Sequence, residues 1–302
     1  MSLTIRKATR QGITPLIVVY SESGCGKTYS SLLMARGLAG PNGRIIMGDS
    51  ESGRGELYAD IPIIGGYDVI PMSAPFTPAS YVEVIELMQK EGATVGIIDS
   101  GSHEWEGTDG VLDLAMENEH KSGRAGLHNW KAPKFEHAKF IQALLRAKIP
   151  LIVCLRAKYK TRQAKENGKT VIVKDDHTSP IQAEDFIFEA TCHGEIMPDH
   201  KFRLTKWSHP GLKDCFPKDG PITIQTGELI AQWCKTPTGE TKPSVDVSAQ
   251  DWSHLMASLT SLEELQTEWM KWDKIKSHFS QEDQVSVRTA KDKRKTELKE
   301  AS

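Results

Sequence analysis

The sequence lacks closely spaced pairs of cysteines and has no large excess of charge of either sign. Its five cysteines are scattered and include no Cys-x-x-Cys pair, which favours reduced thiols over a disulfide framework or a zinc site. The net charge of −2 excludes a global electrostatic attraction to nucleic acid or anionic lipid. Any DNA binding must therefore come from a local patch.

Long apolar runs are also missing, and we find neither internal repeats nor low-complexity tracts. No stretch reaches the length of a membrane-spanning helix, and residues 1–11 are polar and lack the apolar core of a signal peptide. We therefore expect a cytoplasmic protein with no membrane partner. With 302 residues, 38% of them hydrophobic, the chain can form one sizeable α/β domain and a small appendage.

In the first half of the chain, short apolar strands alternate with helical patterns. This alternation predicts repeated βαβ units and a mainly parallel sheet. The predicted strands are 15–20, 44–47, 69–72, 94–98 and 150–155, and the predicted helices are 28–38, 78–90 and 134–148. Thr77 followed by Pro78 is a typical helix start, with a capping hydroxyl and a proline at the first helical position.

The second half of the chain has a different character. Residues 158–174 are basic and contain Asn167-Gly168, a strong signal for a β-hairpin. Segments 186–191 and 201–207 are predicted to add antiparallel strands to the sheet, and 227–234 to form a helix. We thus expect a domain at 1–235, a linker at 236–250, and a helical C-terminal module at 251–302, in which Trp269 and Trp272 share a core-facing side.

The strongest motif is a phosphate-binding loop between the first strand and the first helix. Residues 21–28 fit the P-loop pattern, except that Ser21 stands in place of its first glycine. Backbone N–H groups of such a loop wrap a phosphate, and the following helix directs its positive end at the same anion. We therefore predict ATP and Mg²⁺ as cofactors. The predicted nucleotide-binding residues are Glu22, Ser23, Gly24, Cys25, Gly26, Lys27 and Thr28.

Acidic residues at the ends of two later strands complete the predicted site. Lys27 is expected to bridge the β- and γ-phosphates, while Thr28 and Asp99 are expected to hold Mg²⁺. Glu51 lies where a carboxylate can activate the attacking water, and nearby Asp49 could serve either the metal or the structure. Two further acids, Glu104 and Glu106, are alternative bases.

These motifs together resemble the RecA-like core, in which the P-loop is followed by a strand ending Asp-x-Glu and later by Asp-Ser. Here these are Asp49-Ser50-Glu51 and Asp99-Ser100. More narrowly, the chain resembles phage-encoded RecA-like ATPases, the phage nucleotide-binding proteins of the Sak-type recombination group. The residues that carry this closer resemblance are Ser102-His103-Glu104-Trp105, Leu155-Arg156-Ala157-Lys158 and Thr205-Lys206.

The resemblance implies a RecA-type sheet, ATP hydrolysis at subunit interfaces of a ring or filament, and action with single-stranded DNA in phage recombination. It assigns Glu51 as the catalytic glutamate and Asp99 as the Walker-B aspartate. It also places Lys206 where such proteins supply a basic residue to a neighbouring subunit's γ-phosphate. A second basic residue is expected just after it, but Trp207 stands there, so Lys201 and Arg203 are alternatives.

The basic hairpin is the predicted DNA contact, because loops at this position of RecA-like proteins face the DNA. Cations there could bind phosphates while Tyr159 stacks on a nucleobase. The candidate residues are Lys158, Lys160, Arg162 and Lys169. A loop expected at 119–134, which also contains cations, is a second candidate.

We therefore expect a RecA-like ATPase, stimulated by DNA, whose C-terminal helices could bind a single-strand-binding protein. Two alternatives stay open. One is a P-loop kinase of a nucleoside or small metabolite, with residues 158–174 as its lid. The other is an ATP-gated adaptor or loader without significant turnover.

Overall fold

The computed structural model describes residues 12–166, 169–235, 249–276 and 279–300. Contacts within the chain divide it into two units, Met1–Pro237 and Thr238–Ser302. The predicted linker at 236–250 lies outside the described residues, except for 249–250, which begin a helix. In the described part of the chain, no helix is both long and apolar enough to cross a membrane.

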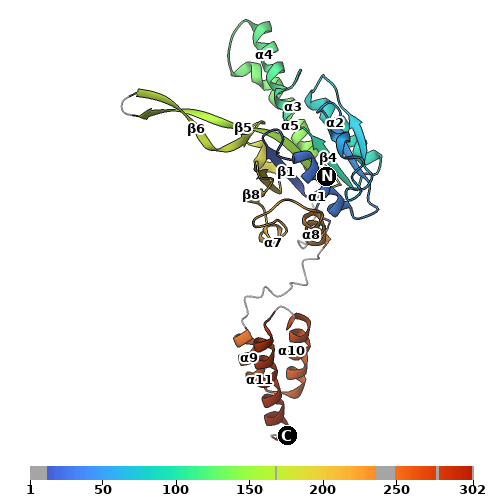
Figure 1. Ribbon diagram of the computed structural model, residues 1–302, viewed down its shortest axis with the longest axis vertical. Coiled ribbons are helices and arrows are strands. Elements are labelled where there is room, and N and C mark those ends of the chain that lie inside the picture. The colour runs from blue at the N-terminus through green and yellow to red at the C-terminus, as the bar shows by residue number, and fades with distance from the viewer. Residues whose placement is uncertain (1–11, 167–168, 236–248, 277–278, 301–302) are drawn as a thin grey trace, which may run out of the picture. The chain divides into compact units, whose positions relative to one another are not determined.

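The first unit is built on one mainly parallel sheet (Figure 1). Its strand order is β3-β2-β4-β5-β1-β7-β8, parallel from β3 to β7, with β8 antiparallel to β7 and β6 paired to β5. The strands are β1 Leu16–Ser21, β2 Ile45–Asp49, β3 Asp68–Pro71, β4 Val95–Asp99, β5 Leu151–Glu166, β6 Lys169–Pro180, β7 Cys192–Ile196 and β8 Phe202–Trp207. This arrangement confirms the predicted α/β class and is that of a RecA-like P-loop core.

Helices cover both faces of the sheet because its central strands are buried on both sides. One core lies under α1 (Lys27–Ala39) and α8 (Ile224–Lys235), and the other under α2 (Pro78–Lys90) and α5 (Lys131–Arg146). Helix α2 begins as predicted, since the Thr77 hydroxyl accepts a hydrogen bond from the Ser80 N–H. Shorter elements are η1 Arg54–Tyr58, α3 Ser102–Glu106, α4 Val111–Ser122, η2 Leu127–Trp130, α6 Phe186–Glu189 and α7 Pro210–Lys213.

Two predictions from the sequence are wrong. Segment 186–191 is not an antiparallel strand, because 186–189 form α6 and the next strand, β7, pairs parallel to β1. The region 119–134 is not one loop, because α4 extends to Ser122 and α5 begins at Lys131. Helix α4 has a weak sequence signal, since Val111 and Ala115 are its buried residues and its second half is polar.

The predicted β-hairpin is confirmed as a long ribbon that extends away from the rest of the first unit (Figure 1). Strand β5 lies in the sheet up to Arg156 and pairs with β6 from Ala157 onward. Within the ribbon, Arg162 lies opposite Val173 and Glu166 opposite Lys169. The predicted turn residues, Asn167 and Gly168, lie outside the described residues.

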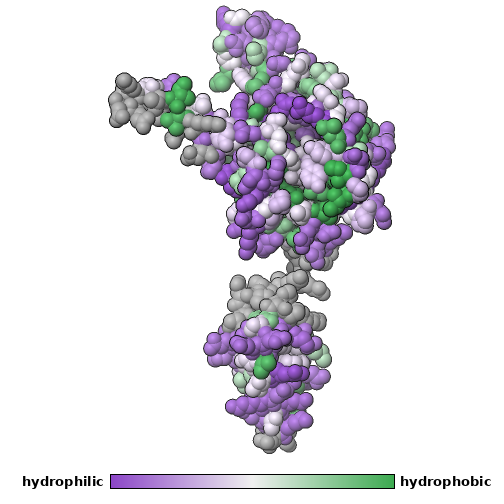
Figure 2. All heavy atoms as spheres, viewed as in Figure 1, coloured by the Kyte–Doolittle hydropathy of each residue, from purple (hydrophilic) through white to green (hydrophobic). Residues whose placement is uncertain are grey.

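In its described residues, 249–276 and 279–300, the second unit forms helices α9 (Ala249–Ser258), α10 (Leu262–Ile275) and α11 (Gln281–Glu300). Its core contains Trp272, with Trp269 partly buried against it, so both tryptophans pack inside this unit as expected. Hydrophilic side chains cover most of the face of this unit that is visible in Figure 2.

Candidate nucleotide-binding site

The phosphate-binding loop connects the end of β1 to the start of α1. Gly24 and Gly26 have φ angles of +87° and +92°, a left-handed backbone that side chains with a Cβ rarely adopt. Ser21 stands in place of the usual glycine, and its hydroxyl donates to the carbonyl of Glu22 at 2.8 Å. The His200 ring, from the turn between β7 and β8, lies with its Nδ1 3.0 Å from the Cys25 carbonyl. The sequence carried no signal for this support by His200.

The Lys27 ammonium group lies across the loop. Its Nζ donates to the carbonyls of Ser21 and Glu22 at 3.2 and 3.1 Å, and to the Ser21 hydroxyl at 3.3 Å. A P-loop lysine binds phosphate as a point charge with three rotatable donors. Lys27 is therefore positioned to exchange these neutral acceptors for phosphate oxygens.

Thr28 and Asp99 supply the oxygen ligands that suit Mg²⁺. The Thr28 hydroxyl donates to the Asp99 Oδ2 at 2.6 Å. Burial raises the pKa of Asp99 to about 6, against the opposing effect of this hydrogen bond. A bound divalent cation favours the ionised carboxylate. Among the described residues, no group of three or more His, Cys, Asp or Glu could hold a metal ion.

Asp49 has a structural role. Its carboxylate accepts hydrogen bonds from the Glu51 N–H at 2.6 Å and the Gly55 N–H at 3.1 Å. These bonds shape the turn after β2 and so fix the backbone from which the Glu51 side chain projects. Of the two roles left open for Asp49, the geometry favours structure over metal binding.

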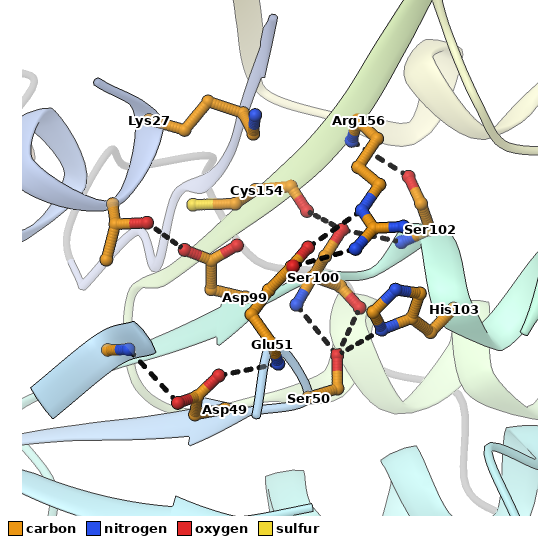
Figure 3. A network of polar contacts seen from close by, with 12 residues as sticks. Lys27, Asp49, Ser50, Glu51, Asp99, Ser100, Ser102, His103, Cys154 and Arg156 are labelled. Carbon is orange, nitrogen blue, oxygen red and sulfur yellow. Dashed lines mark hydrogen bonds and ion pairs between the residues drawn. The ribbon is translucent and has the colours of Figure 1, made fainter. Parts of the chain in front are cut away.

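Glu51 forms a bidentate ion pair with Arg156. Arg156 donates through Nε to Oε1 at 2.8 Å and through Nη2 to Oε2 at 2.7 Å (Figure 3). Burial raises the pKa of Glu51, but the hydrogen bond and charge of Arg156, together with the charges of His103 and Lys27, outweigh this effect, so the pKa lies below its ordinary value. Arg156 has no predicted role in the sequence analysis beyond the family resemblance, although a charged residue directly after the apolar run 151–155 was a usable signal.

The two alternative bases differ in environment. Glu104 is fully buried, and its carboxylate contacts the His137 Nδ1 at 2.9 Å and accepts from the Gln182 Nε2 at 3.1 Å. It therefore joins α3 to α5 and to the segment after β6. Glu106 is exposed and lines the same cavity as Glu51.

A cavity of about 580 Å³ brings the predicted residues together. Its volume is within the range of small-molecule sites. Its lining includes Gly24, Lys27, Thr28, Glu51, Asp99 and Arg156. Because the carboxyl ends of parallel strands β1, β2, β4 and β5 meet at this edge of the sheet, the site lies where ligands bind in open α/β sheets.

The residues after Asp99 join the ends of three strands below the cavity. The Ser50 hydroxyl donates to the Ser100 carbonyl at 3.1 Å, accepts from the Ser100 N–H at 2.9 Å, and contacts the His103 Nδ1 at 2.8 Å (Figure 3). The Ser102 hydroxyl accepts from the Arg156 N–H at 2.9 Å. The distinctive Ser-His motif therefore supports the site rather than entering it.

The three candidates for action on a neighbouring subunit all bind groups of their own chain. Lys206 Nζ donates to the carbonyls of Ala190, at 2.7 Å, and Phe188. Lys201 pairs with Asp219 at 2.9 Å, and Arg203 pairs with Glu195. The cavity lining, as far as the described residues form it, includes none of the three, so a role on a neighbouring subunit stays a prediction.

The hairpin cations begin next to the cavity. Lys158 and Lys160 are exposed, and Lys160 pairs with Glu184 at 3.1 Å. Both lysines line a neighbouring hollow of about 380 Å³, which shares Glu106 and Ile181 with the nucleotide cavity. Arg162 and Lys169 lie further along the ribbon, on β5 and β6.

Comparison with protein-family models and with curated proteins finds no match to this chain. Among solved structures, the chain is similar to a KaiC-like protein from the hyperthermophilic archaeon Pyrococcus horikoshii. The TM-score is 0.38 and the identity 12%, over 65% of this chain and 80% of that one. So loose a likeness transfers no function. The strand order and the position of the loop between β1 and α1 agree with the predicted RecA-like P-loop fold class.

Proposed function

We propose that this chain binds ATP with Mg²⁺ at residues 22–28 and hydrolyses it. The observation that carries the proposal is the convergence of Lys27, Thr28, Asp99 and Glu51 on one cavity. These residues come from β1–α1, β2 and β4, which are far apart in sequence. A phosphate-binding loop alone indicates binding, whereas a carboxylate beside it adds the means of activating water.

Each residue has a distinct task in this reaction. The loop N–H groups and Lys27 bind the phosphates. Thr28 and Asp99 would hold Mg²⁺, which would supply positive charge to the phosphate oxygens when bound. Glu51 takes a proton from water as the water oxygen bonds to the terminal phosphorus. The bond from that phosphorus to the β–γ bridging oxygen breaks, and ADP leaves with this oxygen.

An ATPase assay on the full chain with Mg²⁺ tests the proposal. Lys27→Ala should abolish nucleotide binding, whereas Glu51→Gln should retain binding and lower turnover by about 100-fold or more, the usual contribution of a general base. Glu83→Gln removes an exposed carboxylate on α2 and serves as the matched control. Unchanged turnover in Glu51→Gln would exclude Glu51 as the base, and Glu106→Gln would be tested next.

The same assay separates the two alternatives. A P-loop kinase transfers the terminal phosphoryl group of ATP to its acceptor rather than to water, so release of free phosphate with ATP alone counts against it. An ATP-gated adaptor binds ATP with negligible turnover under all conditions.

We further propose that the ATPase acts with single-stranded DNA in phage recombination or replication, through the β5–β6 hairpin. The support is the family resemblance together with the exposed Lys158 and Lys160 at the base of a ribbon that extends from the sheet (Figure 1). Phosphate contacts of this kind are independent of sequence and sensitive to salt.

Fluorescence anisotropy of labelled single-stranded DNA, with Mg²⁺ and ATP at low salt, tests this second proposal. The Lys158→Ala/Lys160→Ala variant should weaken binding and lower the slope of log affinity against log salt by about one to two. Lys90→Ala/Lys148→Ala, which changes two exposed lysines elsewhere, is the control. Equal affinities of the two variants would remove the hairpin from the proposal, and no anisotropy change in the wild type would refute DNA binding.

Self-association as a ring or filament is part of the same proposal, with Lys206, Lys201 or Arg203 acting on a neighbouring subunit. A further part is that the C-terminal helices bind a single-strand-binding protein. Sedimentation with ATP and with ADP tests self-association, and should show assembly that depends on the nucleotide. Deletion of residues 251–302 tests the role of the C-terminal helices, and should abolish capture of the single-strand-binding protein.

A further inference from the structure

The carboxylate proposed as the base is engaged by a cation of its own chain. Both oxygens of Glu51 accept hydrogen bonds from the Arg156 guanidinium, at 2.8 and 2.7 Å. Bidentate pairs of this kind are the strong ones. A carboxylate held in this way is a poor proton acceptor, because accepting a proton would cost it the ion pair. The ion pair therefore opposes water activation as long as it persists.

The part of Arg156 that can move is its side chain. Its backbone is held on both sides, since its N–H donates to the Ser102 hydroxyl at 2.9 Å and its carbonyl accepts from the Ile181 N–H at 2.7 Å. The Arg156 side chain is 41% exposed, whereas that of Glu51 is 13% exposed. Rotation about the side-chain bonds therefore changes the partner of the guanidinium without disturbing the strand.

A terminal phosphate is the competing partner that the cavity would admit. Arg156 and Lys27 line the same cavity as the loop glycine Gly24. A phosphate presents more charge and more acceptor oxygens than one carboxylate, and the guanidinium fork matches it equally well. ADP lacks this phosphate, so the competition depends on the triphosphate.

We propose that the Glu51–Arg156 ion pair is the resting state of the site, and that the terminal phosphate of a nucleoside triphosphate takes Arg156 away from Glu51. This inference rests on the proposed ATP binding and adds a condition to it. Glu51 becomes available to activate water only when a triphosphate occupies the site. Arg156 thus acts twice, as a ligand of the terminal phosphate and as a restraint on the base.

The position of Arg156 also links this exchange to the hairpin. Arg156 is the last residue of β5 paired with β1, and Ile181, which its carbonyl binds, directly follows β6. Gln182, the next residue, donates to the Gly101 carbonyl at 3.0 Å. The outgoing strand of the hairpin therefore leaves the sheet, and the returning strand ends, at residues anchored beside the nucleotide cavity.

Binding of a fluorescent non-hydrolysable ATP analogue and of fluorescent ADP to the full chain, with Mg²⁺, tests the inference. Arg156→Ala should weaken binding of the ATP analogue by about tenfold or more, as expected for loss of a charge-assisted pair. Its affinity for ADP should change by no more than about twofold. Arg146→Ala, which removes an exposed arginine on α5, is the control and should change neither affinity. If Arg156→Ala does not fold, Arg156→Lys carries the same test, because lysine keeps the charge but lacks the fork.

A double-mutant cycle isolates the ion pair itself. When Arg156 is present, Glu51→Gln should tighten binding of the ATP analogue, because the substitution frees the guanidinium. In the Arg156→Ala background, the same substitution should increase this affinity less. The inference would be overturned if Glu51→Gln had equal effects in both backgrounds. It would also be overturned if Arg156→Ala lowered the affinities for the ATP analogue and for ADP equally. Neither result would contradict the proposal that the chain hydrolyses ATP. A wild type that binds neither nucleotide would instead overturn the proposed function, and the inference with it.

Discussion

The Thr28 hydroxyl donates a 2.6 Å hydrogen bond to the carboxylate of Asp99, a residue 71 positions later in the chain. Thr28 follows β1 and Asp99 ends β4, and β5 lies between these two strands in the sheet. The hydrogen bond therefore reaches across the end of β5, and it holds the two proposed Mg²⁺ ligands next to each other.

The buried Asp99 carboxyl predicts a trade of stability for function. Because burial raises its pKa from 3.8 to about 6, the folded state binds the proton more tightly than the unfolded state. The contribution of Asp99 to the stability of the metal-free protein should therefore fall as pH rises from about 4 to about 6, by at most about 3 kcal/mol. Asp99→Asn should abolish this fall and raise metal-free stability at pH 7, as measured by urea unfolding from pH 4 to pH 8.

A matched variant separates this effect from a general change of charge. Asp113→Asn, on the partly exposed first turn of α4, should leave the pH dependence as in the wild type. If Asp99→Asn and the wild type show the same pH profile, Asp99 does not carry a raised pKa. Loss of Mg²⁺-dependent nucleotide binding in Asp99→Asn should accompany its added stability.

The buried Glu104–His137 contact predicts a large loss of stability without a direct role in chemistry. His137→Ala leaves a fully buried carboxylate with Gln182 as its remaining side-chain partner. The cost should be about 3 kcal/mol, as is typical when one member of a buried pair is removed. Thermal or urea unfolding measures it, with His128→Ala, at an exposed position, as the control. Equal stabilities of the two variants would show that the contact contributes little.

The close approach of α1 and α8 predicts that Gly37 tolerates no side chain. A Cβ at Gly37 would lie 2.0 Å from the Ile224 carbonyl oxygen and 2.9 Å from the Gly227 Cα, both backbone atoms that cannot rotate away. Gly37→Ala should therefore destabilise the first unit by about 2 kcal/mol or more through overpacking. Gly66→Ala, where a Cβ meets open space, is the control. An unchanged melting temperature in Gly37→Ala would contradict this packing.

Much of the fold could be predicted from local sequence patterns. The apolar strands 94–98 and 150–155 and the capped helix start at Thr77 need only their own residues and a buried environment. Segment 186–189 was misassigned because its Phe and Ile residues favour strands on average, and β propensity depends strongly on context. There, Phe186 packs into the core from a single helical turn.

The sequence by itself determined the phosphate-binding loop, because Gly24, Gly26, Lys27 and Thr28 act through local backbone geometry and one helix start. It also indicated Asp99 and Glu51, since each ends or follows an apolar strand. Only the tertiary structure decided which carboxylate is buried with His137 and which is paired with Arg156, 105 residues away from Glu51. The physical reason is that these partners depend on strand order, and the insertion of β5 between β1 and β4 is a non-local outcome of packing the whole sheet.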